Sequence, residues 1–169
     1  VYKRQDLIAG LPTDTPESFK NSLDSIVRLN AECITVHTLC MKRASRLTTE
    51  GVTLDLQQAR DAREMLAYTQ NILGQNEYIP YYMYRQSRMV GNLENVGWSK
   101  KGFESLYNVY VMDETHTILA CGSGGVTKLK RNNPDYLERI FNFKYPYEYI
   151  DRFDELIQRK SGIMQFYGQ

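Results

Sequence analysis

The opening segment constrains the fold most, because it has the pattern of a strand, a helix and a second strand in succession. Leu7–Leu11 is a continuous apolar run, typical of a strand that is covered on both faces. Thr15 is a good N-cap and Pro16 suits the first helical position, so a helix is predicted over 16–29. Residues 33–39 are apolar and β-branched and predict a second strand. A βαβ unit joins parallel strands by a right-handed crossover, so an α/β fold is expected.

The carboxyl ends of parallel strands are where α/β proteins place their binding residues. Gly10–Pro12 ends the first predicted strand, and His37–Met41 ends the second. We therefore predict that these two segments lie on one rim of the sheet and form part of a site.

A long helix follows the two strands. Residues 54–74 carry apolar side chains at helical spacing, and Gly74 is the predicted stop. After it, short tyrosine-rich, strand-like runs are separated by Gly, Asn and Lys. We therefore divide the chain near residue 76 into an α/β part, 1–75, and a mixed α+β part, 76–169.

The second part is predicted to contain several strands and a closing helix. Its strand-like runs are residues 78–90, 105–112, 116–122 and 139–144. Pro146 is expected to open the last helix. The apolar face of that helix would be formed by Tyr149, Ile150, Phe153, Leu156 and Ile157.

Composition and charge narrow the classes of function. The chain has 169 residues, 42% of them hydrophobic, and a net charge of +1, which gives no electrostatic basis for binding nucleic acid. No apolar run approaches the roughly 20 residues that span a bilayer, and no signal peptide is recognisable, so a cytoplasmic protein without a membrane span is expected. Cys33, Cys40 and Cys121 lack metal-ligand spacing and are interpreted as free thiols, with no metal site predicted.

Taken alone, the polar and glycine positions of the rim have ordinary explanations. Asp6, at the head of a strand taken to be buried, is more often structural than an acceptor for a ribose diol. Gly10 is more often a turn residue, and His37 a satisfied core histidine. The GSGG stretch, 122–125, is only a weak phosphate-loop pattern.

Two stretches carry a resemblance to a known family. "DLIAGLPTDTPESF" (6–19), followed by "ITVHTLCMKRAS" (34–45), resembles the later barrel strands of radical S-adenosylmethionine enzymes, and above all the oxygen-independent coproporphyrinogen III oxidase and dehydrogenase group. The segment "YRQ…GNLENVG" (84–97) looks most like the corresponding segment of the HemZ-type members of that group. The likeness runs to about Lys160. It implies the last βαβ part of a partial radical SAM (β/α) barrel, followed by a mixed α+β C-terminal region.

The resemblance also implies a reaction and its cofactors. Members use S-adenosylmethionine and a [4Fe-4S] cluster to decarboxylate two propionates of coproporphyrinogen III oxidatively, on the route to haem. The electron donor is not indicated. By resemblance, the cofactor-binding residues would be Asp6, Ile8, Gly10, His37, Thr38 and Leu39, with Asp6 on the ribose and Ile8 on the adenine. Candidate partners of the substrate carboxylates are Lys42, Arg43, Arg46, Tyr84, Arg85 and Gln86, of which Arg85 is the preferred one.

The chain departs from the family pattern in two respects. Thr13 replaces the usual glycine after Leu-Pro, and the C-x-x-x-C-x-x-C cluster loop is absent. We interpret the chain as the C-terminal portion of a longer enzyme, inactive by itself, with native sequence expected from Asp6 and not from residues 1–5. Two alternatives stay open: an inert gene fragment, or a haem-binding chaperone of the same superfamily, whose H-N-x-x-Y-W motif lacks its histidine here at 106–110.

A truncated barrel would leave one strand edge without its neighbour. We therefore expect Leu7, Ile8, Ile34 and Val36 to be less buried than parallel strands require. The region after residue 76, with its own helices and strands, is expected to be better packed.

Overall fold

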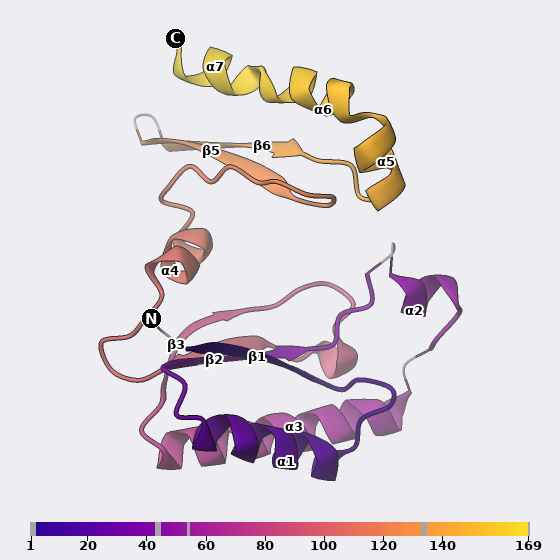
Figure 1. Ribbon diagram of the computed structural model, residues 1–169, viewed down its shortest axis with the longest axis vertical. Helices are drawn as coiled ribbons and strands as arrows, with labels where there is room; N and C mark the ends of the chain where they lie inside the picture. Colours follow the sequence, from indigo (N-terminus) through magenta and orange to yellow (C-terminus); the bar gives the residue numbers. More distant parts are fainter. Residues whose placement is uncertain (1–2, 43–44, 54, 133–134, 169) are drawn as a thin grey trace. The chain divides into compact units, whose positions relative to one another are not determined.

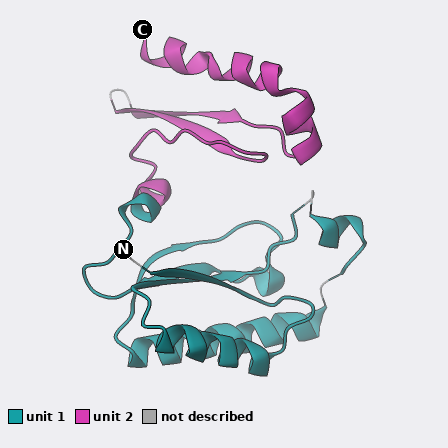
Figure 2. Ribbon diagram, viewed as in Figure 1, with its two compact units in different colours: residues 1–109 teal, residues 110–169 magenta. Residues whose placement is uncertain are grey.

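The structure is a computed structural model that describes residues 3–42, 45–53, 55–132 and 135–168 (Figure 1). It divides into two compact units, residues 1–109 and residues 110–169 (Figure 2). The division predicted near residue 76 does not coincide with this boundary, because the two strands that follow residue 76 join the sheet of the first unit.

Unit 1 is a four-stranded sheet with two long helices on one of its faces (Figure 1). Its elements are β1 (Arg4–Ala9), α1 (Pro16–Arg28), β2 (Cys33–Thr38), α2 (Arg46–Thr49), α3 (Leu56–Gln75), β3 (Ile79–Tyr84), η1 (Val90–Asn92) and β4 (Asn95–Ser99). The strand order is β1-β2-β4-β3. The β1–β2 pair is parallel, as predicted, whereas β4 runs antiparallel to both β2 and β3. The mixed α/β character is confirmed.

Local chemistry explains where the two long helices begin. At α1, Thr15 is the N-cap and Pro16 occupies the first turn, as predicted, and Ser18 completes a capping box with Thr15. At α3, Asp55 caps the backbone N–H of Gln58, and the Gln58 side chain returns to the N–H of Asp55.

The prediction that Gly74 stops α3 is wrong. The helix continues to Gln75, and the positive φ of 63° that ends the turn belongs to Glu77. The first apolar residue of the helix, Leu56, is 80% exposed. The buried residues of α3 are Ala62, Met65, Thr69 and Leu73.

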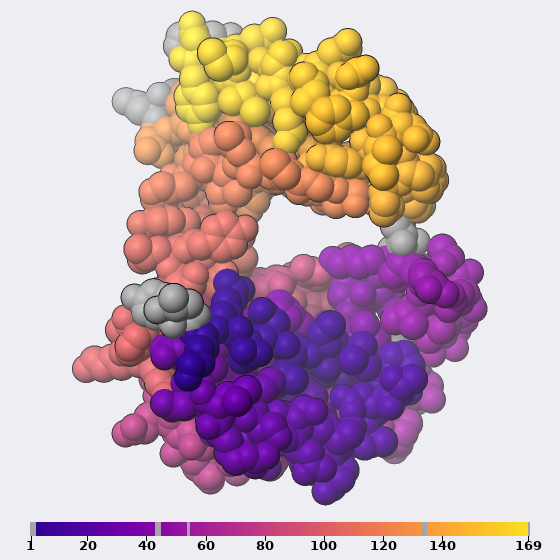
Figure 3. Space-filling model, in the orientation of Figure 1, coloured from indigo at the N-terminus to yellow at the C-terminus, as the bar shows by residue number. Residues whose placement is uncertain are grey.

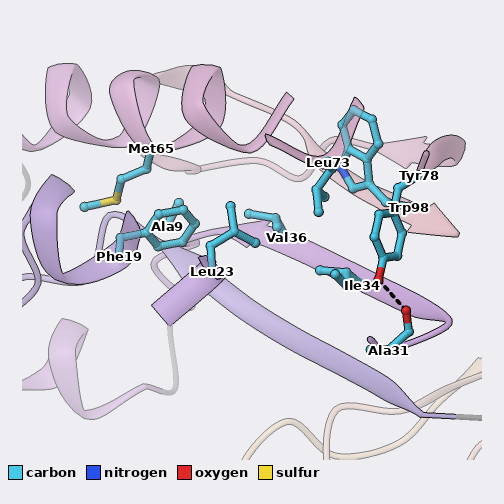
Figure 4. Close-up of a cluster of buried hydrophobic side chains, with 10 residues drawn as sticks. All are labelled: Ala9, Phe19, Leu23, Ala31, Ile34, Val36, Met65, Leu73, Tyr78 and Trp98. Carbon is cyan, nitrogen blue, oxygen red and sulfur yellow. Dashed lines mark hydrogen bonds between the residues drawn. The ribbon is translucent and has the colours of Figure 1, made fainter. Parts of the chain in front are cut away.

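The core of unit 1 lies between these helices and the sheet (Figure 4). Phe19 and Leu23 come from α1, Met65 and Leu73 from α3, and the strands contribute their inward-facing residues. The cluster consists of Ala9, Phe19, Leu23, Ala31, Ile34, Val36, Met65, Leu73, Tyr78 and Trp98. Because side chains alternate along a strand, every second residue of each strand points to the opposite face of the sheet.

Unit 2 is built on a hairpin and three short helices. Its elements are β5 (Val126–Asn132), β6 (Asp135–Phe141), α5 (Pro146–Asp151), α6 (Phe153–Lys160) and α7 (Gly162–Tyr167), while α4 (Leu106–Asp113) crosses the boundary between the units. The single predicted closing helix is thus three helices, with breaks at Arg152 and Ser161. Of its predicted apolar face, Leu156 is buried, but Ile150, Phe153 and Ile157 are largely exposed.

Two of the predicted strands do not form. Residues 105–112 lie mostly in helix α4, although their aromatic and β-branched residues favour a strand. In the run 116–122, Ile118 forms an isolated bridge with Lys128 of β5 and no strand is assigned. The run 139–144 is only partly a strand, because β6 ends at Phe141.

The expected loss of burial is confirmed at one strand only. In β1, Leu7 is half-buried and Ile8 is 42% exposed. The prediction is wrong for Ile34 and Val36, which are fully buried, because β4 pairs with β2 on the side away from β1. The better packing predicted after residue 76 is also wrong, since large apolar side chains are exposed along unit 2.

Among the described residues, no helix has the length and apolar character that a membrane crossing requires.

Candidate functional site

The sheet of unit 1 presents one face to α1 and α3, and the opposite face carries polar and aromatic side chains. Strand alternation and register place these residues together. We call this the polar face; its residues are Asp6, Ile8, Thr35, His37, Tyr82, Tyr84, Asn95 and Gly97. Helices on one side of an α/β sheet leave the other side for ligands or further chain, so this face is the candidate site.

Tyr82 reaches across the sheet from the edge strand β3. Its hydroxyl lies 3.0 Å from the hydroxyl of Thr35 on β2, and its ring passes over Gly97 of β4. A Cβ at Gly97 would lie 1.8 Å from the Tyr82 ring, so glycine is required at this position. The ring in turn covers Thr35, which is only 1% exposed.

Tyr84 makes the second crossing, parallel to the first. Its ring stacks beside that of Tyr82 at an interplanar angle of 9°. The Tyr84 hydroxyl lies 3.3 Å from Nδ1 of His37, and His37 Nε2 lies 3.3 Å from Oδ1 of Asp6. The other oxygen of Asp6 lies 3.8 Å from Nε of Arg4. A hydrogen-bonded chain therefore runs from β3 through β2 to β1.

Burial raises the pKa of both tyrosines above the ordinary phenol value, and at Tyr84 the nearby Asp6 carboxylate adds to the effect. Both phenols are therefore protonated at neutral pH and can donate hydrogen bonds. Asp6, by contrast, is about half exposed. The expectation of a buried aspartate is wrong, because Asp6 lies within β1 on the polar face and not at its head.

Three of the predicted cofactor residues lie elsewhere. Gly10 adopts a positive φ of 83°, and a Cβ there would lie 3.2 Å from that of Ala62 on α3, so the glycine accommodates the helix. Thr38 is buried, and its backbone N–H donates to Oδ1 of Asn95 at 2.7 Å. Leu39 is buried in a small cluster with Ala62. Asp6, Ile8 and His37 are the predicted cofactor residues that the structure brings together on the polar face.

The candidate partners of substrate carboxylates are already engaged in side-chain contacts. Arg85 forms an ion pair with Glu94, Lys42 donates to Oε1 of Gln86, and Arg46 pairs with Glu50 on α2. Arg43 lies outside the described residues. Tyr84 is on the polar face, as described above. Any anion bound by Arg85 would have to compete with Glu94.

Among the residues that the structure describes, no three His, Cys, Asp or Glu side chains are grouped as a metal site. Cys33 is buried with its thiol donating to the carbonyl of Phe103, Cys40 donates to the carbonyl of Ser87, and Cys121 is exposed. These contacts agree with the interpretation of the cysteines as free thiols.

Four residues of the polar face were not predicted from the sequence: Thr35, Tyr82, Asn95 and Gly97. The alternation of Tyr82 and Tyr84 in the run "YYMY" is a signal for two tyrosines on one face of a strand. The glycine under Tyr82 has no local signal, because its role depends on the pairing of β3 with β4 and on the irregular register between Pro80 and Tyr82.

Comparison with known proteins gives one curated relative and one solved structure. The chain is 36% identical over 160 residues to the oxygen-independent coproporphyrinogen-III oxidase-like protein HemZ of Bacillus subtilis, an alignment that covers 95% of this chain. The resemblance to the HemZ-type coproporphyrinogen oxidase group is confirmed. The chain spans about a third of the length of that relative, 32%.

The solved structure shares the fold. It is the coproporphyrinogen III oxidase HemN of Escherichia coli, described as a radical SAM enzyme, and it matches with a TM-score of 0.53 at 17% sequence identity. The match covers 90% of this chain and 34% of the HemN chain. No family model matches the sequence.

Proposed function

We propose that this chain is part of a radical SAM coproporphyrinogen III dehydrogenase, which decarboxylates coproporphyrinogen III oxidatively to protoporphyrinogen IX. The observation that carries the proposal is the 36% identity to the HemZ protein across nearly the whole chain. The polar face supports the proposal, because it lies on the helix-free side of an α/β sheet. It supplies the carboxylate of Asp6, the exposed aliphatic side chain of Ile8 and two hydrogen-bonded tyrosines.

The donor set of the polar face fits the adenosyl part of S-adenosylmethionine. A ribose diol offers two hydroxyl donors, and Asp6 offers a half-exposed carboxylate to accept them. Ile8, 42% exposed on the same face of β1, is an apolar surface suited to an adenine ring. Bound with its cluster, the cofactor would supply the radical that abstracts hydrogen from the substrate. The described residues offer no thiolate set for the cluster.

The substrate would interact with this chain through its carboxylates. Arg85 is half exposed and carries a planar fork that suits a propionate, with Glu94 as the anion to be displaced. We assign Arg85 to binding and orientation of the substrate only.

A chimaera tests the proposed function. The segment of the Bacillus subtilis HemZ protein that aligns with this chain is replaced by this chain, and anaerobic conversion of coproporphyrinogen III is measured with reconstituted protein. We expect conversion, and Asp6→Ala should weaken S-adenosylmethionine binding by about 1.5–3 kcal/mol, the usual value for a hydrogen bond to a charged group. A folded chimaera with its cluster but without conversion contradicts the proposal; tight haem binding in that case would favour a haem chaperone.

The 169-residue chain by itself is expected to bind no iron–sulfur cluster and to form no 5′-deoxyadenosine. Cys33 and Cys40 are held in separate contacts and Cys121 is exposed, and the three are not spaced as a compact thiolate loop. Anaerobic reconstitution followed by visible absorbance and iron analysis checks this. A stoichiometric cluster would contradict it.

A further inference from the structure

His37 lies between two partners of opposite hydrogen-bonding character. An ionised Asp6 can only accept, so Nε2 of His37 must carry a proton to bond with it. The phenol of Tyr84 then donates to Nδ1, which in neutral imidazole is the free acceptor. One tautomer of neutral His37, with its proton on Nε2, therefore satisfies both contacts.

This arrangement fixes the orientation of Asp6, which would otherwise be a half-exposed side chain free to rotate. Oδ1 is held by His37, at 3.3 Å, and Oδ2 lies towards Arg4, at 3.8 Å. His37 itself is held by Tyr84, whose ring is packed against Tyr82 and is partly buried. The chain of contacts transmits the rigidity of the packed tyrosines to an exposed carboxylate.

We propose that Tyr84 and His37 are positioning residues, which hold the Asp6 carboxylate in the orientation that accepts hydrogen bonds from the ribose of the cofactor. The proposal rests on the proposed function for the identity of the ligand. Tyr84 is thereby assigned to the cofactor side of the site, whereas the sequence had suggested a role in binding the substrate carboxylates.

Tyr82 provides a matched control. Both tyrosines come from β3, both have a hydroxyl bonded to a side chain of β2, and burial raises the pKa of both. The Tyr82 hydroxyl contacts Thr35, whereas the Tyr84 hydroxyl contacts His37, which in turn contacts Asp6. The Tyr84 hydroxyl has an additional side-chain hydrogen bond with Asn95. Removing either hydroxyl costs the sheet side-chain hydrogen bonds, but only Tyr84→Phe should affect Asp6.

The tautomer can be observed directly in the 169-residue chain. The chain has two histidines, His37 and His116, so ¹⁵N spectra of histidine-labelled protein are simple to assign. The ¹⁵N shifts distinguish the two neutral tautomers from imidazolium, and neutral His37 should be in the Nε2–H form. Tyr84→Phe should shift the Nδ1 signal towards that of an acceptor without a hydrogen bond, and Tyr82→Phe should not. An Nδ1–H form of His37, or equal effects of the two variants, would overturn the proposal.

The active chimaera gives a second readout. Tyr84→Phe should raise the KM for S-adenosylmethionine about threefold to tenfold, the usual range for one lost hydrogen bond, with the KM for coproporphyrinogen unchanged. His37→Ala should have a larger effect, and His37→Gln, which can both donate to Asp6 and accept from Tyr84, should restore most of the affinity. Tyr84→Phe should add nothing in an Asp6→Ala background.

The two proposals fail in different ways. An inactive wild-type chimaera contradicts the proposed function, and the ¹⁵N spectra still decide whether the Tyr84–His37–Asp6 chain exists. An active chimaera in which Tyr84→Phe and Tyr82→Phe behave alike overturns only the positioning role.

Discussion

The two units hold their chains together by different interactions. In unit 1, two helices and a sheet enclose a continuous apolar cluster, with Leu23, Ile34 and Met65 fully buried. Unit 2 leaves many large apolar side chains exposed, several of them on α5, α6 and α7, whose surface is drawn in orange to yellow in Figure 3. These are Tyr110, Met112, Leu119, Tyr136, Phe141, Tyr145, Tyr147, Ile150, Phe153, Ile157, Met164 and Tyr167. Unit 1 should therefore owe more of its stability to apolar burial than unit 2.

Contacts between charged and aromatic groups take a larger part in unit 2. The guanidinium groups of Arg152 and Arg159 lie 4.2 and 4.1 Å from the ring centre of Phe143. Glu155 pairs with both arginines, at 2.6 and 2.7 Å. Each such contact in water is weak, and its strength depends on charge. The two units should therefore respond differently to truncation of apolar groups and to pH.

The largest effect is expected from Leu23→Ala in unit 1. Leu23 is fully buried between α1 and the sheet, so its truncation should lower the free energy of unfolding by about 2–5 kcal/mol. Leu119→Ala in unit 2 removes the same atoms from a side chain that is 62% exposed, and should change stability by less than about 0.5 kcal/mol. Calorimetry would measure both, and the fluorescence of Trp98, the single tryptophan, identifies the transition of unit 1. Equal losses would contradict the comparison.

A smaller effect is expected from Gly97→Ala on the polar face. The new Cβ would lie within 1.8–2.5 Å of three atoms of the Tyr82 ring, so the ring must move and its bond to Thr35 is lost. Overpacking of this kind costs about 1–3 kcal/mol in unfolding experiments. The cost should largely disappear in a Tyr82→Ala background, where the clash is absent. A cost that persists there would mean that Gly97 has another role.

Gly74→Ala is also a glycine-to-alanine substitution, but it is expected to increase the free energy of unfolding. Gly74 lies inside α3, its φ is not positive, and a Cβ there would meet no atom within 4 Å. Alanine restricts the unfolded chain more than glycine does, so unit 1 should gain about 0.4–1 kcal/mol. Urea unfolding followed by Trp98 fluorescence measures this gain. A loss of stability would restore Gly74 to the helix-stopping role that the sequence suggested.

The error at Gly74 illustrates what the sequence could specify. The start of α1 was predictable because Thr15 and Pro16 act on their immediate neighbours. The end of α3 was not, because Asn76 and Glu77 can end a helix as well as a glycine can, and the competing choices differ by little free energy. Helix α4 was missed for a related reason: its local preference for a strand is overridden in the folded chain.

The candidate site was predictable in part. The parallel pairing of β1 with β2 followed from the βαβ pattern, and with it the proximity of Asp6 and Ile8 to His37. The crossing of Tyr82 and Tyr84 depends on two antiparallel pairings between strands far apart in the sequence, one of them irregular. No local pattern specifies such a register, so the connection of Tyr84 to Asp6 through His37 could be found only from the structure.

The smallest effect is expected from acid, and it should fall mainly on unit 2. Hydrogen bonds from Arg159 and Arg152 lower the pKa of Glu155, and those from Lys128 and Arg139 lower the pKa of Glu114. In unit 1, the pKa of Glu32 is lowered by the backbone N–H of Lys3. A carboxyl with a lower pKa in the folded state stabilises that state above its unfolded pKa. The stabilisation is lost as the pH falls through the folded pKa, so acid should weaken both units, and unit 2 more.

The melting temperature of each unit, followed by calorimetry from pH 7 to about pH 3, tests this difference. The transition of unit 2 should move further than that of unit 1, which Trp98 fluorescence identifies. Glu155→Gln should lower the melting temperature of unit 2 at pH 7 and flatten its dependence on pH, because the pairing with Arg152 and Arg159 is then absent at every pH. Glu138→Gln on exposed β6 makes the same change of charge and should alter the profile less. If the two variants have the same pH profile, the Glu155 contacts contribute no specific stability, and the distinction between the two units would then rest on apolar burial alone.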